Sequence, residues 1–133
     1  MKKFLLDTHV LLWAIGASDE LSPQVFENIS SRENEVFVSA ISLWEIALKQ
    51  SLGKLEFNFA VEDIPKHCEQ MGFYLIPLMP LEALDFLKLP PKKNHKDPFD
   101  RMLIYQCIRG NYILVSKDDK MKLYESDGLE CIW

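Results

Sequence analysis

The sequence predicts an α/β fold in which helices cover both faces of a central parallel sheet. Short apolar runs rich in β-forming residues alternate with segments whose apolar residues have helical spacing, which is typical of a parallel sheet. Two of these runs end directly before or near an aspartate, Asp7 and Asp118. The chain has 133 residues, of which 48% are apolar and 26% charged. This size and composition are those of one ordinary globular domain, so we expect a single domain over residues 1–133.

Five segments have the composition of strands. Residues 4–6 form a buried apolar run near the N-terminus, and residues 35–39 and 112–115 are rich in β-branched and aromatic side chains. Residues 73–78 form a further candidate, and residues 129–133 a last strand at the edge of the sheet.

Helices are expected between these strands, and capping residues mark their ends. Ser22 and Pro23 suit the N-cap and the first position of one helix, and Asp97 and Pro98 suit the same positions of another. Glycine is a common residue just beyond a helix. The expected helices cover residues 10–15, 22–29, 41–48, 63–72, 81–87 and 97–110, with a short one through 123–124.

Several function classes do not fit this sequence. Its three cysteines are widely spaced without a C-x-x-C pair, which argues against a disulfide framework or a zinc site and favours a reducing cytoplasm. No apolar run approaches the roughly 18 residues of a membrane span. The net charge of -5 is not that of an electrostatic nucleic-acid binder. If the substrate is nucleic acid, a divalent cation in an acidic cluster could reverse the local charge.

Asp7 and Glu45 each have two interpretations. Asp7 follows the first strand, where it is either a functional acid at the carboxyl end of the sheet or the N-cap of the next helix. Glu45 interrupts the apolar face of its helix, and a buried carboxylate is costly unless it is paired or binds a metal. Its alternative is a surface ion pair with Lys49.

The remaining acids come in two pairs. Asp97 suits the N-cap before Pro98, whereas Asp100 lies in the first helical turn, near the ends of the strands, and is the better functional candidate. Asp118 comes at the same edge of the sheet as Asp7, and Asp119 is either a helix cap or a second ligand.

Together the acids indicate a pocket for Mg²⁺, which prefers oxygen ligands and retains several waters. Thr8 and Ser116 are candidates to hold the acids or the metal-bound waters, or are ordinary turn residues. His95 is expected to be a solvated loop residue, and Trp13, Trp44 and Phe99 are expected in the core.

Four motifs in order resemble the PIN-domain proteins, in particular the VapC-like toxin ribonucleases of type II toxin–antitoxin systems. They are residues 5–13 (LLDTHVLLW), 39–46 (SAISLWEI), 97–104 (DPFDRMLI) and 114–118 (LVSKD). The resemblance covers nearly the whole chain and implies a three-layer α/β/α sandwich with a central parallel sheet. It also implies an endoribonuclease that depends on Mg²⁺ or Mn²⁺, is usually a homodimer, and is held inactive by a co-expressed antitoxin.

The resemblance assigns the catalytic acids to Asp7, Glu45, Asp100 and Asp118, with the metal on Asp7, Asp100 and Asp118. Ser116 occupies a supporting position where threonine is commoner, and Thr8, Asp97 and Asp119 are further supporting candidates. A cytoplasmic protein that cleaves RNA is therefore expected. Metal-activated water would attack the phosphodiester and leave 5′-phosphate and 3′-hydroxyl ends.

Two alternatives belong to other classes. One is a PIN fold that binds RNA or a protein partner without cutting, which the intact set of acids argues against. The other is a phosphohydrolase of small phosphate esters, which would require a D-x-D motif after the first strand, where Asp7-Thr8-His9 stands instead.

Overall fold

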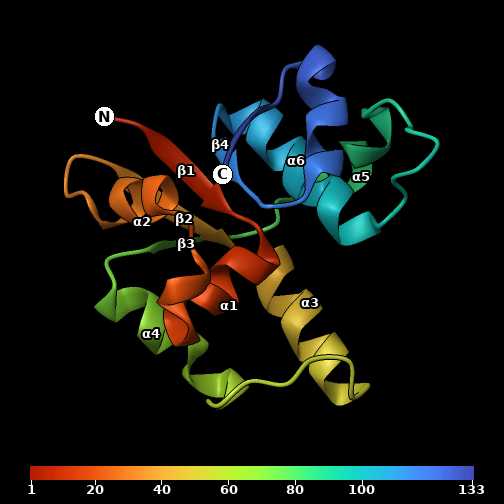
Figure 1. Ribbon diagram of the computed structural model, residues 1–133. Coiled ribbons are helices and arrows are strands. Elements are labelled where there is room, and N and C mark those ends of the chain that lie inside the picture. The colour runs from red at the N-terminus through yellow and green to blue at the C-terminus, as the bar shows by residue number, and fades with distance from the viewer.

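A five-stranded parallel sheet forms the centre of the computed structural model, which describes residues 1–133 (Figure 1). The strand order is β3-β2-β1-β4-β5, and each neighbouring pair is parallel. The chain therefore builds the sheet outward from β1 in one direction and then crosses back to continue on the other side. The strands are β1 (Lys3–Leu6), β2 (Glu35–Ser39), β3 (Tyr74–Ile76), β4 (Ile113–Val115) and β5 (Glu130–Ile132).

Helices cover both faces of the sheet, so the predicted three-layer α/β/α sandwich is confirmed (Figure 1). Short 3-10 helices, η1 to η4, join or extend several of the α-helices. The α-helices are α1 (Thr8–Gly16), α2 (Pro23–Ser30), α3 (Ala40–Ser51), α4 (Ile64–Gln70), α5 (Pro80–Asp85) and α6 (Pro98–Gly110). The 3-10 helices are η1 (Ser18–Glu20), η2 (Val61–Asp63), η3 (Phe86–Lys88) and η4 (Asp119–Asp127).

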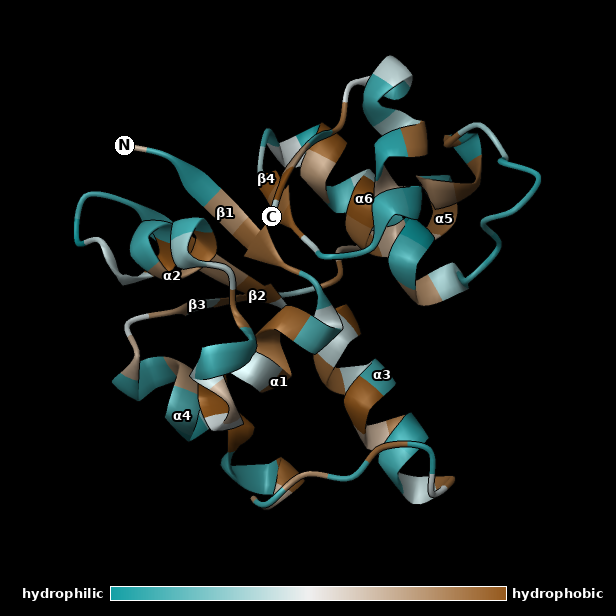
Figure 2. Ribbon diagram, viewed as in Figure 1, coloured by the Kyte–Doolittle hydropathy of each residue, from teal (hydrophilic) through white to brown (hydrophobic).

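Two apolar cores lie on the two faces of the sheet. Alternate residues of β1 point to opposite faces, so Phe4 and Leu6 join the core beneath α1, α2 and α4, whereas Leu5 joins the core beneath α6. Figure 2 shows the strands coloured as apolar between these layers. Such near-continuous apolar strands are expected where a parallel sheet is buried on both faces.

The helix ends agree with the capping signals. The Ser22 hydroxyl accepts a hydrogen bond from Val25 N at 3.1 Å and caps α2, which has Pro23 in its first turn. Gly53 and Gly72 follow α3 and α4 with φ of 70° and 77°, a conformation that glycine adopts at little cost. None of the helices is long and apolar enough to cross a membrane.

Three local expectations differ from the structure. The third strand is shorter than residues 73–78, and the expected short helix near residue 123 is the longer 3-10 helix η4. The prediction that Trp44 lies in the core is wrong, because its side chain is 55% exposed. In α3 the buried positions are Ile41, Ser42, Glu45 and Ile46, which leaves Trp44 on the outer flank, edge-on to the Phe99 ring.

Candidate active site at the carboxyl edge of the sheet

Asp7 stands where β1 ends and α1 begins, and its side chain is buried. Its backbone N–H donates to Val115 O at 3.0 Å, which extends the pairing of β1 with β4 by one residue. Its Oδ1 accepts a hydrogen bond from Val10 N at 2.9 Å, so the capping interpretation is correct. The cap fixes the carboxylate at the edge of the sheet that the functional interpretation requires.

Glu45 is buried on α3, although it is a charged residue. Thr8 donates its hydroxyl hydrogen bond to Glu45 Oε1 at 2.6 Å, and the Lys49 ammonium pairs with Oε2. The ion pair with Lys49 therefore exists, but it joins a buried carboxylate rather than two surface side chains. The Thr8 contact links α1 to α3 and turns Glu45 toward the carboxyl end of β1.

Asp97 and Asp100 divide the roles that the sequence suggested for them. Asp97 Oδ1 accepts a hydrogen bond from Asp100 N at 3.0 Å, which makes Asp97 the N-cap of α6. Asp100 lies in the first turn, and its Oδ2 is 3.3 Å from Nε2 of His95.

The prediction that His95 is a solvated loop residue is wrong. His95 is 4% exposed, and its Nδ1 is 2.9 Å from the Tyr124 hydroxyl. Arg101 Nη1 donates to the same hydroxyl at 3.1 Å, and Arg101 Nη2 donates to Leu89 O at 2.8 Å. This network ties the loop before α6 to η4. Sequence reasoning missed it because Tyr124 is 29 residues from His95, and the only signal was the position of His95 two residues before Asp97.

Asp118 follows β4 by three residues and caps η4, since its Oδ1 accepts from Lys120 N at 2.9 Å. The Ser116 hydroxyl accepts from Asp118 N at 3.1 Å and so supports this turn. Asp119, by contrast, has a side chain that is 92% exposed and pairs with Lys122 at 3.4 Å. Asp119 thus lies outside the cluster of acids.

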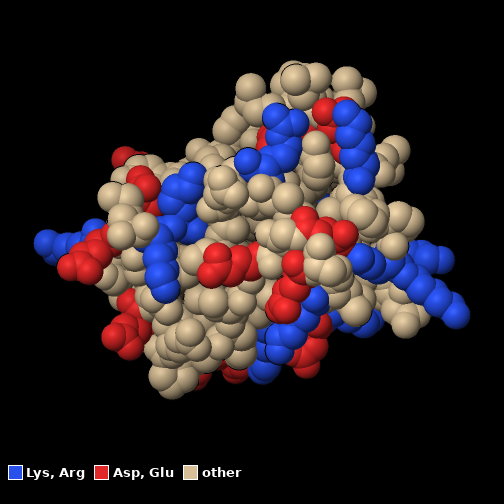
Figure 3. All heavy atoms as spheres, turned by 90° about the horizontal axis from the view of Figure 1, so that it is seen from above, with Lys and Arg blue, Asp and Glu red and all other residues tan.

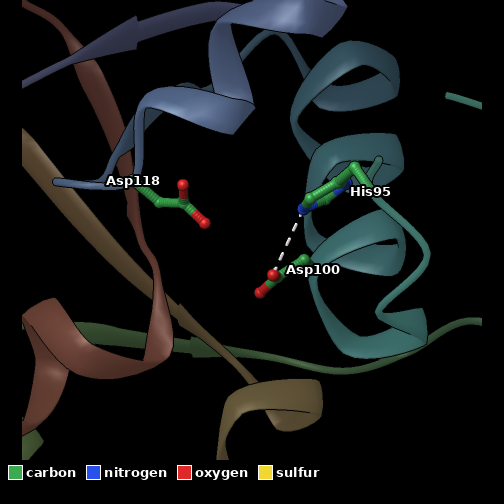
Figure 4. Close-up of side chains that lie close together, drawn as sticks. All are labelled: His95, Asp100 and Asp118. Atoms are coloured by element: carbon green, nitrogen blue, oxygen red, sulfur yellow. Dashed lines mark hydrogen bonds and ion pairs between the residues drawn. The ribbon is translucent and has the colours of Figure 1, made fainter. Parts of the chain in front are cut away.

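His95, Asp100 and Asp118 each present a potential ligand atom, and these atoms lie within 4.8 Å of one another (Figure 4). Figure 4 shows the carboxylates of Asp100 and Asp118 facing one space, with His95 beside Asp100. Asp7 and Asp118 also line a common pocket. The structure therefore brings the acids of β1, α6 and the β4 end to one place, with Glu45 held nearby by Thr8.

The pKa of Asp100 reflects the closeness of these acids. The pKa of Asp100 is raised to about 7, first by burial and then by the charges of Asp97, Glu45, Asp7 and Asp118, in that order. Burial also raises the pKa of Asp7, against the lowering effects of the Ser116 hydroxyl and Val10 N–H. Closely spaced carboxylates in a partly dry cleft favour either a proton or a cation.

The chemistry of these donors fits a hard divalent cation. Carboxylate oxygens are the ligands that Mg²⁺ and Mn²⁺ prefer; Asp100 and Asp118 offer them within 4.8 Å of each other and of His95, and Asp7 lines a pocket with Asp118. Around the molecule, acidic and basic side chains are interspersed on the face drawn in Figure 3, with no continuous basic surface there. A phosphate-bearing ligand would therefore depend on local positive charge at its binding site.

Comparison with known proteins identifies the family of this fold. The model of the PIN domain family matches residues 4–126. The chain belongs to the PIN-domain family. The matched segment contains Asp7, Glu45, Asp100 and Asp118.

Individual relatives of this PIN domain are distant in sequence. Ribonuclease VapC22 of Mycobacterium tuberculosis (strain ATCC 25618 / H37Rv) is 25% identical over 137 residues, and the alignment covers all of both chains. The VapBC2 structure from Rickettsia felis, bound to a promoter DNA fragment, has a TM-score of 0.69 at 18% identity and covers 98% of this chain and 97% of that one. DNA-bound VapBC from Salmonella typhimurium gives 0.62 at 18% identity, covering 99% and 98%. These structures share the fold of this PIN domain.

We expect the replacement Asp100→Asn to stabilise the metal-free protein at alkaline pH. The pKa of Asp100 is 3.8 when unperturbed and about 7 in the folded state, so between these values the unfolded chain binds fewer protons. The free energy of unfolding therefore falls as the pH rises through this range and stays low above it. The asparagine variant has no carboxyl group at this position, so its free energy of unfolding does not fall in this way.

Urea unfolding in EDTA should show the variant more stable than the wild type by about 1–2 kcal/mol at pH 8, and by much less at pH 5. A variant that is less stable than the wild type at pH 8 would contradict the charge-crowding explanation.

Proposed function

We propose that this PIN domain is a metal-dependent endoribonuclease and the toxin of a toxin–antitoxin pair. The observation that carries the proposal is the meeting of Asp7, Asp100 and Asp118 at the carboxyl edge of the sheet, with Glu45 fixed beside them. Similarity to Ribonuclease VapC22 and to VapBC structures supports it. The catalytic set in the proposal is Asp7, Glu45, Asp100 and Asp118.

In this proposal Asp7, Asp100 and Asp118 hold Mg²⁺ or Mn²⁺ through their carboxylate oxygens. The cation, when bound, lowers the pKa of a water and stabilises negative charge on the phosphate. Glu45 orients the attacking water, and its own position is fixed from two sides by Thr8 at Oε1 and Lys49 at Oε2. Both contacts hold the Glu45 carboxyl group in one orientation, and its oxygens keep lone pairs that can accept a hydrogen bond from the water.

The neighbours of Asp100 give its carboxylate a fixed orientation. In this proposal the Tyr124 hydroxyl accepts a hydrogen bond from Arg101 Nη1 and donates its own hydrogen to Nδ1 of His95. His95 then carries its proton on Nε2 and donates it toward Asp100 Oδ2. Burial lowers the pKa of His95, which favours this neutral form of the ring. The chain Arg101–Tyr124–His95 thus positions Asp100 for its metal.

A protein partner also has a place on the surface. An open groove of about 950 Å³ is lined by apolar side chains that include Leu12, Phe57 and Phe59, and by the acids Glu20 and Glu56. Apolar walls with negative charge suit a partner segment that carries apolar and basic residues. We propose that the antitoxin binds there.

The homodimer and the cytoplasmic location remain predictions that accompany this role. Leu81, Leu84 and Leu87 on α5 and η3 are 61%, 72% and 73% exposed, an apolar surface of the kind that interfaces bury.

Replacing Asp118 by asparagine should lower RNA cleavage about 10²–10³-fold, because one charged ligand of the cation is lost. Asp119→Asn is the matched control, since the neighbouring carboxylate is exposed and paired with Lys122. Cleavage of a structured RNA in Mn²⁺, followed on a denaturing gel, measures both variants. The assignment fails if Asp118→Asn, correctly folded by circular dichroism, cleaves like Asp119→Asn. EDTA should stop cleavage by the wild type.

Replacing Tyr124 by phenylalanine should weaken Mn²⁺ binding about tenfold, because the hydrogen bond to His95 is lost and Asp100 is no longer held in one orientation. Binding is measured by calorimetry without RNA, so the readout does not depend on cleavage. Tyr105→Phe is the control, since Tyr105 lies outside the hydrogen-bond chain. Equal Mn²⁺ affinity in the two variants would show that Tyr124 does not position the ligand.

The toxin role predicts that expression of this chain alone arrests growth of a bacterial host. Co-expression of a small DNA-binding protein from an adjacent reading frame should restore growth, as should Asp7→Asn, whose asparagine can still cap α1. Colony counts on inducing medium measure both effects. Growth arrest by Asp7→Asn at wild-type strength would separate toxicity from catalysis.

A further inference from the structure

A shallow pocket of about 320 Å³ opens beside the carboxylate cluster and is lined by Asp7, His9, Trp13, Lys117 and Asp118. Two of the five residues belong to the proposed catalytic set. The side chains of His9, Trp13 and Lys117 have no part in the capping of α1 or η4, nor in the network around Asp100. The pocket therefore joins the acids to a patch of aromatic and cationic side chains that the proposed mechanism does not yet use.

Trp13 offers this pocket a rigid aromatic surface. Its ring centroid is 5.7 Å from that of Trp133 and 6.0 Å from that of His9, and the side chain packs partly against the core beneath α1. The expectation that Trp13 belongs to the core thus describes one side of the residue only. An indole that is held in place by packing loses little conformational entropy when a ligand stacks on it.

Lys117 is an unpaired cation beside two carboxylates. It is exposed, and it takes part in none of the ion pairs of the structure. Its Nζ lies 5.9 Å from the centroid of the Trp13 ring. A protein with a net charge of -5 needs such local cations wherever it binds a phosphate.

We propose that this pocket binds one unpaired nucleotide of the RNA, next to the phosphodiester that is cleaved. The base stacks on the indole of Trp13, and Lys117 pairs with the phosphate of that nucleotide. The inference rests on the proposed function and adds to it a subsite that holds the base and the phosphate of one nucleotide. A base inside a duplex has both faces covered and cannot stack on a side chain.

The chemistry of the lining favours a nucleotide over a basic peptide. A peptide arginine or lysine would meet the positive charge of Lys117, whereas a phosphate is attracted by it. In the free protein the Lys117 ammonium lies over the Trp13 ring. A base stacks on an indole more strongly than an exposed ammonium does, so the base displaces the ammonium, which is then free for the phosphate.

The pocket also connects RNA binding with partner binding. His9 and Trp13 line both this pocket and the larger groove that we assign to the antitoxin. A segment seated in the groove would cover the two rings, so antitoxin and nucleotide would exclude each other.

The test measures binding of a short fluorescein-labelled, single-stranded oligoribonucleotide by fluorescence anisotropy. All proteins carry Asp100→Asn, which prevents cleavage. Lys117→Gln should weaken binding about tenfold, while Lys122→Gln, which removes the same charge from the pair with Asp119, should change it less than about twofold. Trp13→Leu should weaken binding similarly, and Trp13→Phe should restore most of it. The corresponding duplex should bind equally to all of them.

Two results overturn the inference. If the Lys117→Gln and Lys122→Gln proteins bind the oligoribonucleotide equally, the pocket does not hold a nucleotide. This conclusion does not depend on whether the tryptophan variants fold correctly. A pocket that serves only a protein partner would give this result. The wild type, tested separately for RNA cleavage in Mn²⁺, distinguishes this failure from failure of the proposed function. Absence of both cleavage and RNA binding would overturn both.

Discussion

Mutual repulsion among carboxylates in one cleft is the constraint that governs this structure. The pKa of Asp100 is raised to about 7, first by burial and then by the charges of four neighbouring acids. The fold reduces the cost by giving several of the acids backbone N–H donors at the start of a helix. Asp7 accepts from Val10 N, Asp97 from Asp100 N and Asp118 from Lys120 N. Capping groups and positive helix ends thus stabilise charges whose repulsion a divalent cation would relieve.

The topology of the sheet explains why the acids meet. The chain reverses direction across the sheet between β3 and β4, and β1 lies between β2 and β4. Ligand sites in open parallel sheets form at such a switch point, outside the carboxyl ends of the strands. Asp7 and Asp118 follow β1 and β4, and α3 begins directly after β2, so Glu45 lies within two turns of the same edge. Local strand-to-helix geometry therefore positions three of the acids.

Asp100 is positioned differently. Its place in the first turn of α6 could be predicted from Asp97 and Pro98, but the contacts that orient its carboxylate could not. The ends of strands and the caps of helices depend on residues that are neighbours in the sequence, so the positions of Asp7, Asp97 and Asp118 could be predicted from composition and spacing. The start of α6 depends on a loop that His95, Tyr124 and Arg101 hold through contacts between distant residues. No short sequence pattern predicts contacts between residues so far apart in the chain. Trp44 fails for a related reason, because an aromatic residue in an amphipathic helix gives no sign of which flank faces the core.

The overall charge adds a level of control to the proposed activity. At a net charge of -5 the long-range field of the protein repels RNA and attracts a basic partner, most strongly at low ionic strength. Within the site the preference between RNA and a basic partner is the opposite one, because a bound cation and Lys117 together would favour a phosphate over a basic side chain. Encounter therefore favours the antitoxin, while the geometry of the cleft favours the substrate once the antitoxin is gone. In the proposed toxin role, the free protein would then meet RNA mainly when no basic partner is present.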